Sequence, residues 1–185
     1  MLHRPLVTPY QRSVRNRIEF IFKGGKTKRF HTADTATSQT VAEHSFGVAW
    51  LVMVVFPAAR KELILAALSH DLAEHLVGDV SSPTKRKYPA LKAALDVAEH
   101  TLLAEAGLDY ESGLSNLELK ILKLADMLDG MLYCIRERKM GSTMCVEVYN
   151  NFHSYVQEFK GLTLESTETI LIINQMWEDV HNGSK

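Results

Sequence analysis

The amino-acid sequence predicts an all-α protein, folded as a single bundle of about seven helices. Apolar residues recur at intervals of three and four along most of the chain, as they do on one face of an α-helix. No stretch alternates apolar and polar residues in the manner of a half-buried strand. Glycine and proline fall between the periodic segments, where they end helices. We expect one domain over residues 1–185, without an internal repeat or a linker.

Three helices are expected in the first half of the chain, over about residues 10–23, 39–56 and 59–76. The first ends at Gly24 and is followed by a loop rich in Thr, Lys and Asp. The second is apolar on nearly all sides, which is typical of a helix at the centre of a bundle, and Pro57 ends it. The third carries His70 near its end.

Four helices are expected in the second half, over about residues 89–105, 115–139, 143–160 and 164–180. A loop with Gly78 and Pro83 precedes them, and Gly107 ends the first of the four. Ser115 and Glu118 have the spacing of a capping box, in which each residue bonds a free backbone N–H of the other. The sequence therefore predicts where the longest helix begins.

Composition indicates an ordinary globular protein, with 46% hydrophobic and 23% charged residues. Two cysteines are too few for a disulfide framework and suit the reducing cytosol. The first residues lack the apolar stretch of a signal peptide. The most apolar run, residues 46–56, is far shorter than the roughly 20 residues that span a bilayer. We expect a cytoplasmic protein with no membrane contact.

Basic residues concentrate in residues 1–29, which hold eight Lys or Arg and one acid, Glu19. Such runs are usually a solvated surface, although a few of these side chains could meet a small, multiply charged anion. Aromatic residues are not interleaved with the bases as stacking platforms would be. The net charge of −1 gives no general attraction to nucleic acid, so we expect no stable nucleic-acid complex.

Two histidines and two aspartates stand in otherwise apolar helical segments: His44, His70, Asp71 and Asp126. An unpartnered ionisable group in such surroundings is costly, and one cation between three helices would satisfy all four. Consecutive helical residues diverge by about 100°, so His70 and Asp71 can reach one ion only near a helix end. Two imidazoles and two carboxylates suit Mn, Fe, Co, Ni or Zn better than Mg. Taken alone, Asp126 could simply pair with Lys123.

The order His44, His70–Asp71, Asp126 resembles the ligand pattern of the HD-domain metal-dependent phosphohydrolases, which implies an HD-domain helical bundle. Three further segments are similar to small bacterial 5′-deoxynucleotidases: Val41–Ser45, His70–Glu74 and Gly78–Lys85. The segments Lys28–Thr32 and Gln39–Ser45 are closer still to compact phage-type dATP triphosphohydrolases. Residues 29–126 carry this resemblance.

The resemblance implies hydrolysis of a deoxynucleoside triphosphate, with dATP favoured, to the deoxynucleoside and triphosphate by attack at the α-phosphorus. The cofactor would be one or more divalent metal ions, Co, Mn or Zn before Fe or Ni. Glu74 and Asp79 would be the catalytic acids or bases. Side chains expected to bind the substrate are Arg29, Phe30, Thr32, Lys85 and Lys123. The chain would form a homo-oligomer, a dimer or a hexamer, in the host cytoplasm if a phage encodes it.

Several alternatives stay open at this point. The enzyme could instead be a 5′-deoxynucleotidase that releases orthophosphate from monophosphates, or a sensor that binds nucleotide without turnover. Glu74 could support His70 rather than act in catalysis. Asp79 could simply form a turn after Gly78, and Phe30 could anchor its loop to the core.

Overall fold

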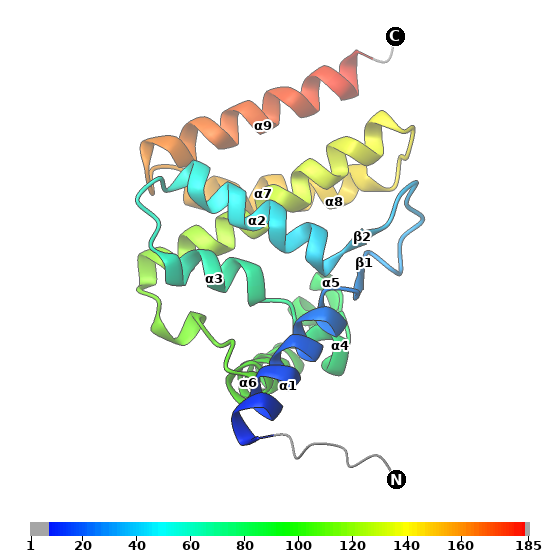
Figure 1. Cartoon of the computed structure of the whole chain (residues 1–185). Coiled ribbons are helices and arrows are strands. Elements are labelled where there is room, and N and C mark those ends of the chain that lie inside the picture. Colours follow the sequence, from blue (N-terminus) through cyan, green and yellow to red (C-terminus); the bar gives the residue numbers. More distant parts are fainter. Residues whose placement is uncertain (1–7, 184–185) are drawn as a thin grey trace.

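Helices make up most of the chain that the computed structural model describes, residues 8–183 (Figure 1). The helices are α1 (Pro9–Gly24), α2 (Val41–Val55), α3 (Lys61–Ser69), α4 (Glu74–Val77), α5 (Ser82–Lys87), α6 (Pro89–Ala106), α7 (Asn116–Lys139), α8 (Cys145–Val156) and α9 (Leu164–Asn182), with short 3-10 turns at Glu111–Gly113 and Gln157–Phe159. The all-α prediction is confirmed. No helix within these residues is long and apolar enough to cross a membrane.

The bundle is built around α2 and α7, which pack against each other. Helices α3, α8 and α9 surround this pair (Figure 1). The core side chains come mainly from α2, α3 and α7, where Val48, Leu63 and Leu124 are fully buried. The apolar second helix of the sequence is thus central, as predicted. Because α2 packs against α3, α7 and α9, the buried polar side chains that it carries, such as His44, are held in fixed positions.

Capping boxes fix where the two central helices begin. The predicted box is confirmed at α7, where the Ser115 hydroxyl accepts from the backbone N–H of Glu118 and the Glu118 carboxylate accepts from that of Ser115. A second box at Thr40 and Glu43 starts α2. Each box satisfies backbone donors that the first turn of a helix leaves free. The box at Thr40 places His44 in the first turns of α2.

A short antiparallel ribbon precedes α2 and was not expected from the sequence. Strand β1 (Lys28–Arg29) pairs with β2 (Gln39–Thr40), with Lys28 opposite Thr40. Two residues per strand are too few to show an alternating pattern, so the sequence carried no signal for it. The ribbon closes the 30–38 loop at its base and brings Arg29 alongside the start of α2.

The predicted third helix over residues 59–76 is wrong. Helix α3 ends at Ser69, residues 70–73 form a turn, and α4 begins at Glu74. In the turn the backbone N–H of Leu72 bonds the carbonyl of Ser69, three residues back, instead of four. Apolar spacing continues through the break, which is why the sequence pattern did not reveal it. The predicted loop after this helix also contains α5.

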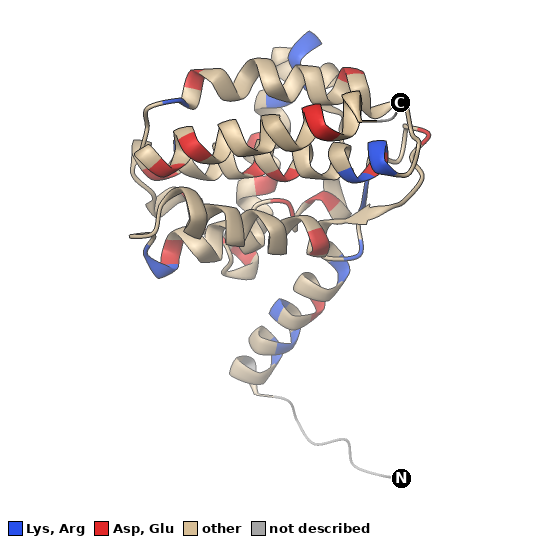
Figure 2. Cartoon of the chain, turned by 90° about the horizontal axis from the view of Figure 1, so that it is seen from above, with Lys and Arg blue, Asp and Glu red and all other residues tan. Residues whose placement is uncertain are grey.

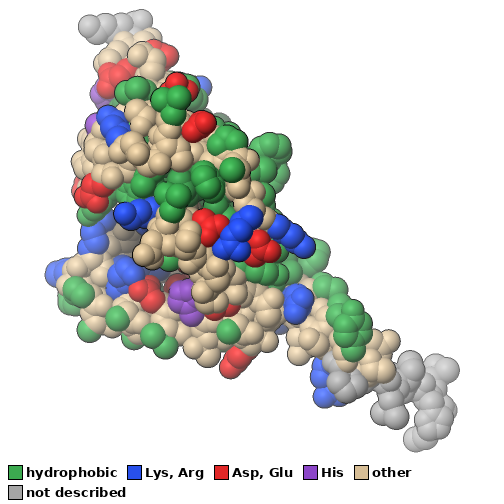
Figure 3. Space-filling view, turned by 90° about the vertical axis from the view of Figure 1, so that its left-hand side faces the viewer, with side chains coloured by type: hydrophobic (Ala, Val, Ile, Leu, Met, Phe, Trp, Pro, Cys, Tyr) green, Lys and Arg blue, Asp and Glu red, His purple; other side chains and the backbone are tan. Residues whose placement is uncertain are grey.

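Helix α1 stands away from the body of the bundle (Figures 2 and 3). It meets the rest of the chain near its C-terminal end, where it contacts α4 and α6. The Phe20 ring packs edge-on against His75, with 4.8 Å between ring centroids. Gly24 lies so close to Leu72 that a Cβ at this position would be 2.4 Å from the Leu72 carbonyl oxygen. This glycine therefore allows α1 to end directly against the turn that carries His70 and Asp71.

Candidate metal centre and active site

His44 lies at the centre of the site and is fully buried, with 0% of its surface exposed. Its Nδ1 is 2.6 Å from the Asp129 carboxylate on α7, which also accepts from Gln39 Nε2 at 2.9 Å. The carboxylate can only accept, so it fixes the proton of His44 on Nδ1 and turns Nε2 toward α3. Gly47 makes this contact possible, because a Cβ there would lie 2.0 Å from Asp129 Oδ1.

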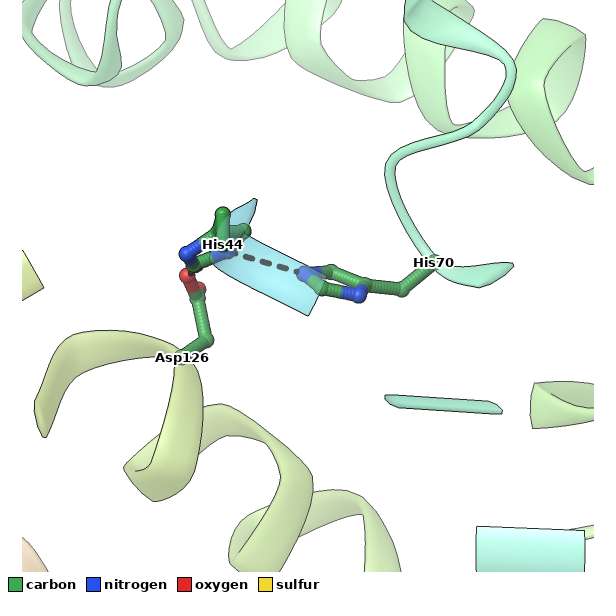
Figure 4. A group of neighbouring side chains, drawn as sticks. All are labelled: His44, His70 and Asp126. Atoms are coloured by element: carbon green, nitrogen blue, oxygen red, sulfur yellow. Dashed lines mark hydrogen bonds and ion pairs between the residues drawn. The ribbon is translucent and has the colours of Figure 1, made fainter. Parts of the chain in front are cut away.

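His70 caps the end of α3 and faces His44 (Figure 4). Its Nδ1 is 3.0 Å from the carbonyl oxygen of Ala67, an acceptor, so the proton of the neutral ring sits on Nδ1. The Nε2 atoms of His44 and His70 are 3.3 Å apart. In the neutral tautomers both of these nitrogens present a lone pair to the same point.

Two carboxylates complete the cluster. Asp126 Oδ1 lies 3.2 Å from His44 Nε2, and Asp71 places Oδ2 3.5 Å from the same atom and Oδ1 3.4 Å from His70 Nε2. Ligand atoms of His44, His70 and Asp126 all lie within 4.8 Å of one another. Because Asp71 follows the end of α3, it can turn toward the same point as His70, as expected for adjacent residues that share an ion.

The four side chains fit a divalent metal ion. Two nitrogen lone pairs and two carboxylates converge with no proton donor of their own in the neutral tautomers, and only a positive charge makes that arrangement stable. Donation of the other ring nitrogen to a carboxylate or a backbone carbonyl is how metal-binding histidines are usually oriented. The mixed nitrogen and oxygen set suits Zn or a similar transition metal.

The electrostatics of the cluster point the same way. Burial opposes a charged His44, but the carboxylates of Asp126 and Asp129 outweigh it and raise the pKa of His44 to about 9. Burial also opposes an ionised Asp126, yet the Lys123 ammonium and the His44 ring hold the pKa of Asp126 well below its usual range. The carboxylates around His44 therefore favour positive charge at this point, which either a proton on His44 or a bound cation can supply.

Arg29 reaches the cluster from strand β1. Its guanidinium bonds Asp71 through Nη1, and its Nη2 lies 3.9 Å from Asp126 Oδ1. The side chain is only 15% exposed, and its Nε is buried without a hydrogen-bond partner. A guanidinium with an unused donor beside the carboxylates is placed to meet an anion that arrives at the metal.

The ring of Phe30 anchors the loop that carries Arg29. Phe30 has a φ of 54°, unusual for a bulky residue, and stacks on Tyr133 with 4.6 Å between centroids. The Arg29 guanidinium lies 5.8 Å from the Phe30 centroid. Near the C-terminal end of the loop, the buried Glu137 carboxylate accepts from the backbone N–H of Thr37 at 2.9 Å. These α7 contacts hold the ribbon and loop against the site.

The other predicted site residues differ in their partners and in their burial. Glu74 begins α4 and is buried, with Oε2 lacking a hydrogen-bond partner. Asp79 is 3.3 Å from His31 Nδ1, and Lys85 Nζ is 3.6 Å from Glu99 Oε1 on α6. Lys123 Nζ lies 2.6 Å from Asp126 Oδ2, which is the salt bridge that the sequence left open. Thr32 is exposed in the loop.

Glu74 differs electrostatically from the other carboxylates of the site. Burial, followed by repulsion from the carboxylates of Asp71 and Asp79, raises the pKa of Glu74 to about 9, against the opposing charges of Arg29 and Lys85. With its pKa this high, Glu74 holds a proton at neutral pH and can donate it. A carboxyl group whose pKa is strongly raised, beside a cluster of histidines and aspartates, is typical of an active site rather than of an ordinary surface position.

A cavity of about 330 Å³ opens beside the cluster, on a face where Figure 3 shows histidine and charged side chains around a hollow. His70, Asp71, Asp126 and Lys123 line one part of it. The lining contributed by α6 and the 3-10 turn is mainly polar: Lys92, Asp96, Glu99, His100 and Glu111. The volume is at the lower end of the range for small-molecule sites, about 300 to 1,000 Å³. A small polar ligand can therefore reach the His–Asp cluster.

The helical bundle and its His–Asp cluster define a hydrolase of the HD-domain phosphohydrolase class. The chain belongs to the 5′-deoxynucleotidase YfbR-like family, whose model matches residues 19–171. A dATP triphosphohydrolase of Salmonella phage PMBT28 is 31% identical to it over an alignment of 155 positions, and the match covers 75% of this chain and 77% of that protein.

Solved structures share the fold at lower identity. An HD-domain phosphohydrolase from Listeria innocua has a TM-score of 0.72 and 18% identity, covering 92% of this chain and 99% of its own. The cyanophage S-2L HD phosphohydrolase DatZ, bound to dA and one catalytic Zn²⁺ ion, has a TM-score of 0.66 and 20% identity, covering 89% and 96%. The HD-domain resemblance inferred from the sequence is therefore confirmed.

Sequence reasoning missed the residues that support the cluster from outside, Asp129 first among them. Asp129 follows Asp126 by three residues, so both lie on the same side of α7, and this spacing was the available signal. Gln39, Tyr133 and Glu137 were also missed. Their partners are 90 or more residues away in the chain, and no local pattern reports such a pairing.

The role of Asp129 can be tested with Asp129→Asn. We expect this change to weaken metal binding by about 10- to 100-fold, because an amide can donate to His44 Nδ1 and no longer fixes the proton there. Titration calorimetry of metal-stripped protein with Zn²⁺ or Mn²⁺ measures the affinity. Asp34→Asn, at an exposed position, is the control and should bind as the wild type does. An unchanged affinity for Asp129→Asn would show that Asp129 does not orient a ligand.

Proposed function

We propose that this chain hydrolyses a deoxynucleoside triphosphate, with dATP favoured, to the deoxynucleoside and triphosphate. Water attacks the α-phosphorus, the bond from that phosphorus to the 5′ oxygen breaks, and the nucleoside leaves with a proton on that oxygen. The observation that carries the proposal is the convergence of two imidazole nitrogens and two carboxylates beside Arg29, at the edge of a small polar cavity. The similarity to the dATP triphosphohydrolase of the Salmonella phage supports the substrate.

His44, His70, Asp71 and Asp126 would hold the divalent ion, with Co, Mn or Zn favoured and Fe or Ni as further candidates. When bound, such an ion polarises a phosphoryl oxygen and lowers the pKa of the attacking water. The Zn²⁺ of DatZ is compatible with this set of metals. An ion held by these four residues would still be open to a water and to a phosphate oxygen of the substrate.

Arg29, Lys85 and Lys123 would supply the charge that a triphosphate needs. In the structure Arg29 is paired with Asp71 and Lys123 with Asp126. A divalent ion on these carboxylates would take over part of their charge, so that both cations become available to phosphate oxygens. Arg29 can grip a phosphate with two donors, whereas the lysines act as point charges. Phe30 and Thr32 would border the base.

Glu74 and Asp79 would handle protons. Glu74 is buried one turn beyond His70, and its raised pKa suits a residue that gives a proton to the departing 5′ oxygen. These two protonation states correspond to two roles. With a cation held by Asp71, the pKa of Glu74 would be lower, and the ionised carboxylate would orient the attacking water instead. Asp79, hydrogen-bonded to His31, would assist from the turn after Gly78.

The second candidate function is hydrolysis of deoxynucleoside monophosphates to orthophosphate, favoured by the description of the matching family. The same bond breaks, and only the group carried by the α-phosphorus differs. A nucleotide sensor without turnover is disfavoured, because the sequence has a metal-binding side chain at every expected ligand position and an acid at both candidate catalytic positions.

We further propose a single catalytic domain that acts in the cytoplasm as a homo-oligomer, a dimer or a hexamer, without a stable nucleic-acid partner.

Product analysis distinguishes these functions. Metal-stripped protein is resupplied with Mn²⁺ or Co²⁺ and given a panel of deoxynucleoside mono- and triphosphates. We expect tripolyphosphate and free deoxyadenosine from dATP at the highest rate, and no turnover by Asp126→Ala, which should keep its helical circular-dichroism spectrum. Orthophosphate from monophosphates alone would replace this function with the 5′-deoxynucleotidase activity. Activity of Asp126→Ala at near wild-type rate would overturn the metal assignment.

Glu74→Gln tests the proton-handling role, since it keeps the shape of the side chain and removes its acid chemistry. We expect kcat to fall by about 10²- to 10⁴-fold with metal content unchanged. Glu147→Gln, an exposed position on α8, is the control and should leave kcat unaltered. A loss of bound metal with a matching loss of rate would instead assign Glu74 to the support of His70. An unaltered rate would exclude both roles.

A further inference from the structure

Asp79, one of the two residues expected to handle protons, lies on an irregular turn between α4 and α5. It follows Gly78, which has a φ of 86° and ends α4, so neither a helix nor a strand fixes its side chain. Among residues 8–183 the only hydrogen-bond partner of its carboxylate is His31, whose Nδ1 lies 3.3 Å from Asp79 Oδ2. This bond joins two segments that are 48 residues apart in the chain.

The backbone at the end of β1 directs three consecutive side chains to three different parts of the site. Arg29 reaches the His–Asp cluster, Phe30 stacks on α7, and His31 reaches the turn after α4 (Figure 1). The chain bends sharply here, because the φ of Phe30 is 54°, in the left-handed region. Strained residues of this kind persist where the surrounding structure fixes them, and they cluster at functional sites. The direction of His31 is therefore set by the backbone of the loop.

The imidazole of His31 is suited to orient a carboxylate. An ionised carboxylate can only accept hydrogen bonds, so the Nδ1–H of His31 is the donor. The His31 side chain is 48% exposed, while that of Asp79 is 21% exposed. The bond therefore ties a largely covered carboxylate to a side chain at the surface. Replacement of His31 can remove this bond without opening a cavity in the core.

Asp79 also lies close to Glu74, the other residue expected to handle protons. After burial and the Asp71 carboxylate, the Asp79 carboxylate is the next cause that raises the pKa of Glu74. Gly78 brings the two acids together, because its N–H bonds the Glu74 carbonyl at 2.8 Å and closes the last turn of α4. A misplacement of about 1 Å at a catalytic group can lower a rate by about 100-fold. The orientation of Asp79 therefore matters to the chemistry of the site.

We propose that His31 is a positioning residue, which holds the Asp79 carboxylate in its working orientation through the Nδ1 hydrogen bond. The inference rests on the proposed function, because Asp79 needs a defined orientation only if it acts on a bound substrate or water. It deepens that function, since neither the metal-ligand pattern nor the expected substrate-binding set gives His31 a role. His31 contacts neither the metal ligands nor the expected phosphate-binding cations, so its loss should lower kcat and leave KM and metal content unchanged.

A double-mutant cycle on His31 and Asp79 tests this role, with kcat and KM measured for dATP or, if monophosphates alone turn over, for dAMP. We expect His31→Ala to lower kcat by about 10- to 100-fold, with KM and bound metal unchanged. In the Asp79→Ala background the same change should have no further effect, because the carboxylate that His31 holds is then absent. His31→Asn should retain most of the wild-type kcat, since its amide nitrogen can replace Nδ1 as the donor.

His181→Ala, at an exposed histidine of α9, is the matched control and should leave kcat unaltered. A further loss from His31→Ala in the Asp79→Ala background would overturn the inference, as would a rise in KM alone. Rescue of His31→Ala by added imidazole, with His31→Asn as slow as His31→Ala, would assign His31 to proton transfer instead of positioning.

Failure of the inference and failure of the proposed function give different results. Full activity of His31→Ala would remove the role of His31 and leave the proposed function standing. A wild type that turns over none of the nucleotides would contradict the proposed function itself, and the inference with it.

Discussion

The structure depends on one electrostatic constraint, the placing of two imidazole nitrogens and two carboxylates at one point between three helices. His44 Nε2 lies 3.3 Å from His70 Nε2 and 3.2 Å from Asp126 Oδ1. Unfilled, such a cluster repels itself and gains nothing from burial. The fold compensates with positive charge from Arg29, from Lys123 and from a proton on His44. A single divalent ion bound between the four side chains would supply the same positive charge.

Several local departures from regular structure serve this cluster. Helix α3 ends at Ser69, so that His70 and Asp71 can turn toward the same point. Gly47 lets Asp129 approach α2 closely enough to orient His44. The ribbon before α2 carries Arg29, and the stacking of Phe30 on Tyr133 holds the attached loop against α7. The turn after Ser69 interrupts the regular helical hydrogen bonding, and Phe30 adopts a strained backbone angle. Both departures help to hold the side chains of the site in place.

Much of this could be read from the sequence, because the helices carry their signals locally. The Ser115 capping box, the buried character of α2 and the ligand order at His44, His70–Asp71 and Asp126 are all patterns of near neighbours. The break after Ser69 was missed because apolar spacing runs through it. Asp129, Tyr133 and Glu137 were missed as site residues because their partners are distant in the chain. Roles within the site depend on such long-range contacts, and sequence patterns alone do not report them.

The most direct test of the account is anomalous diffraction from crystals grown with Zn²⁺ or Mn²⁺. The account predicts one strong anomalous peak at about 2.0 to 2.2 Å from the Nε2 atoms of His44 and His70 and from oxygens of Asp71 and Asp126. Arg29 should then have moved away from Asp71. A peak confined to the acidic α6 wall of the cavity, or no peak at saturating metal, would contradict the claim that this cluster is the metal centre.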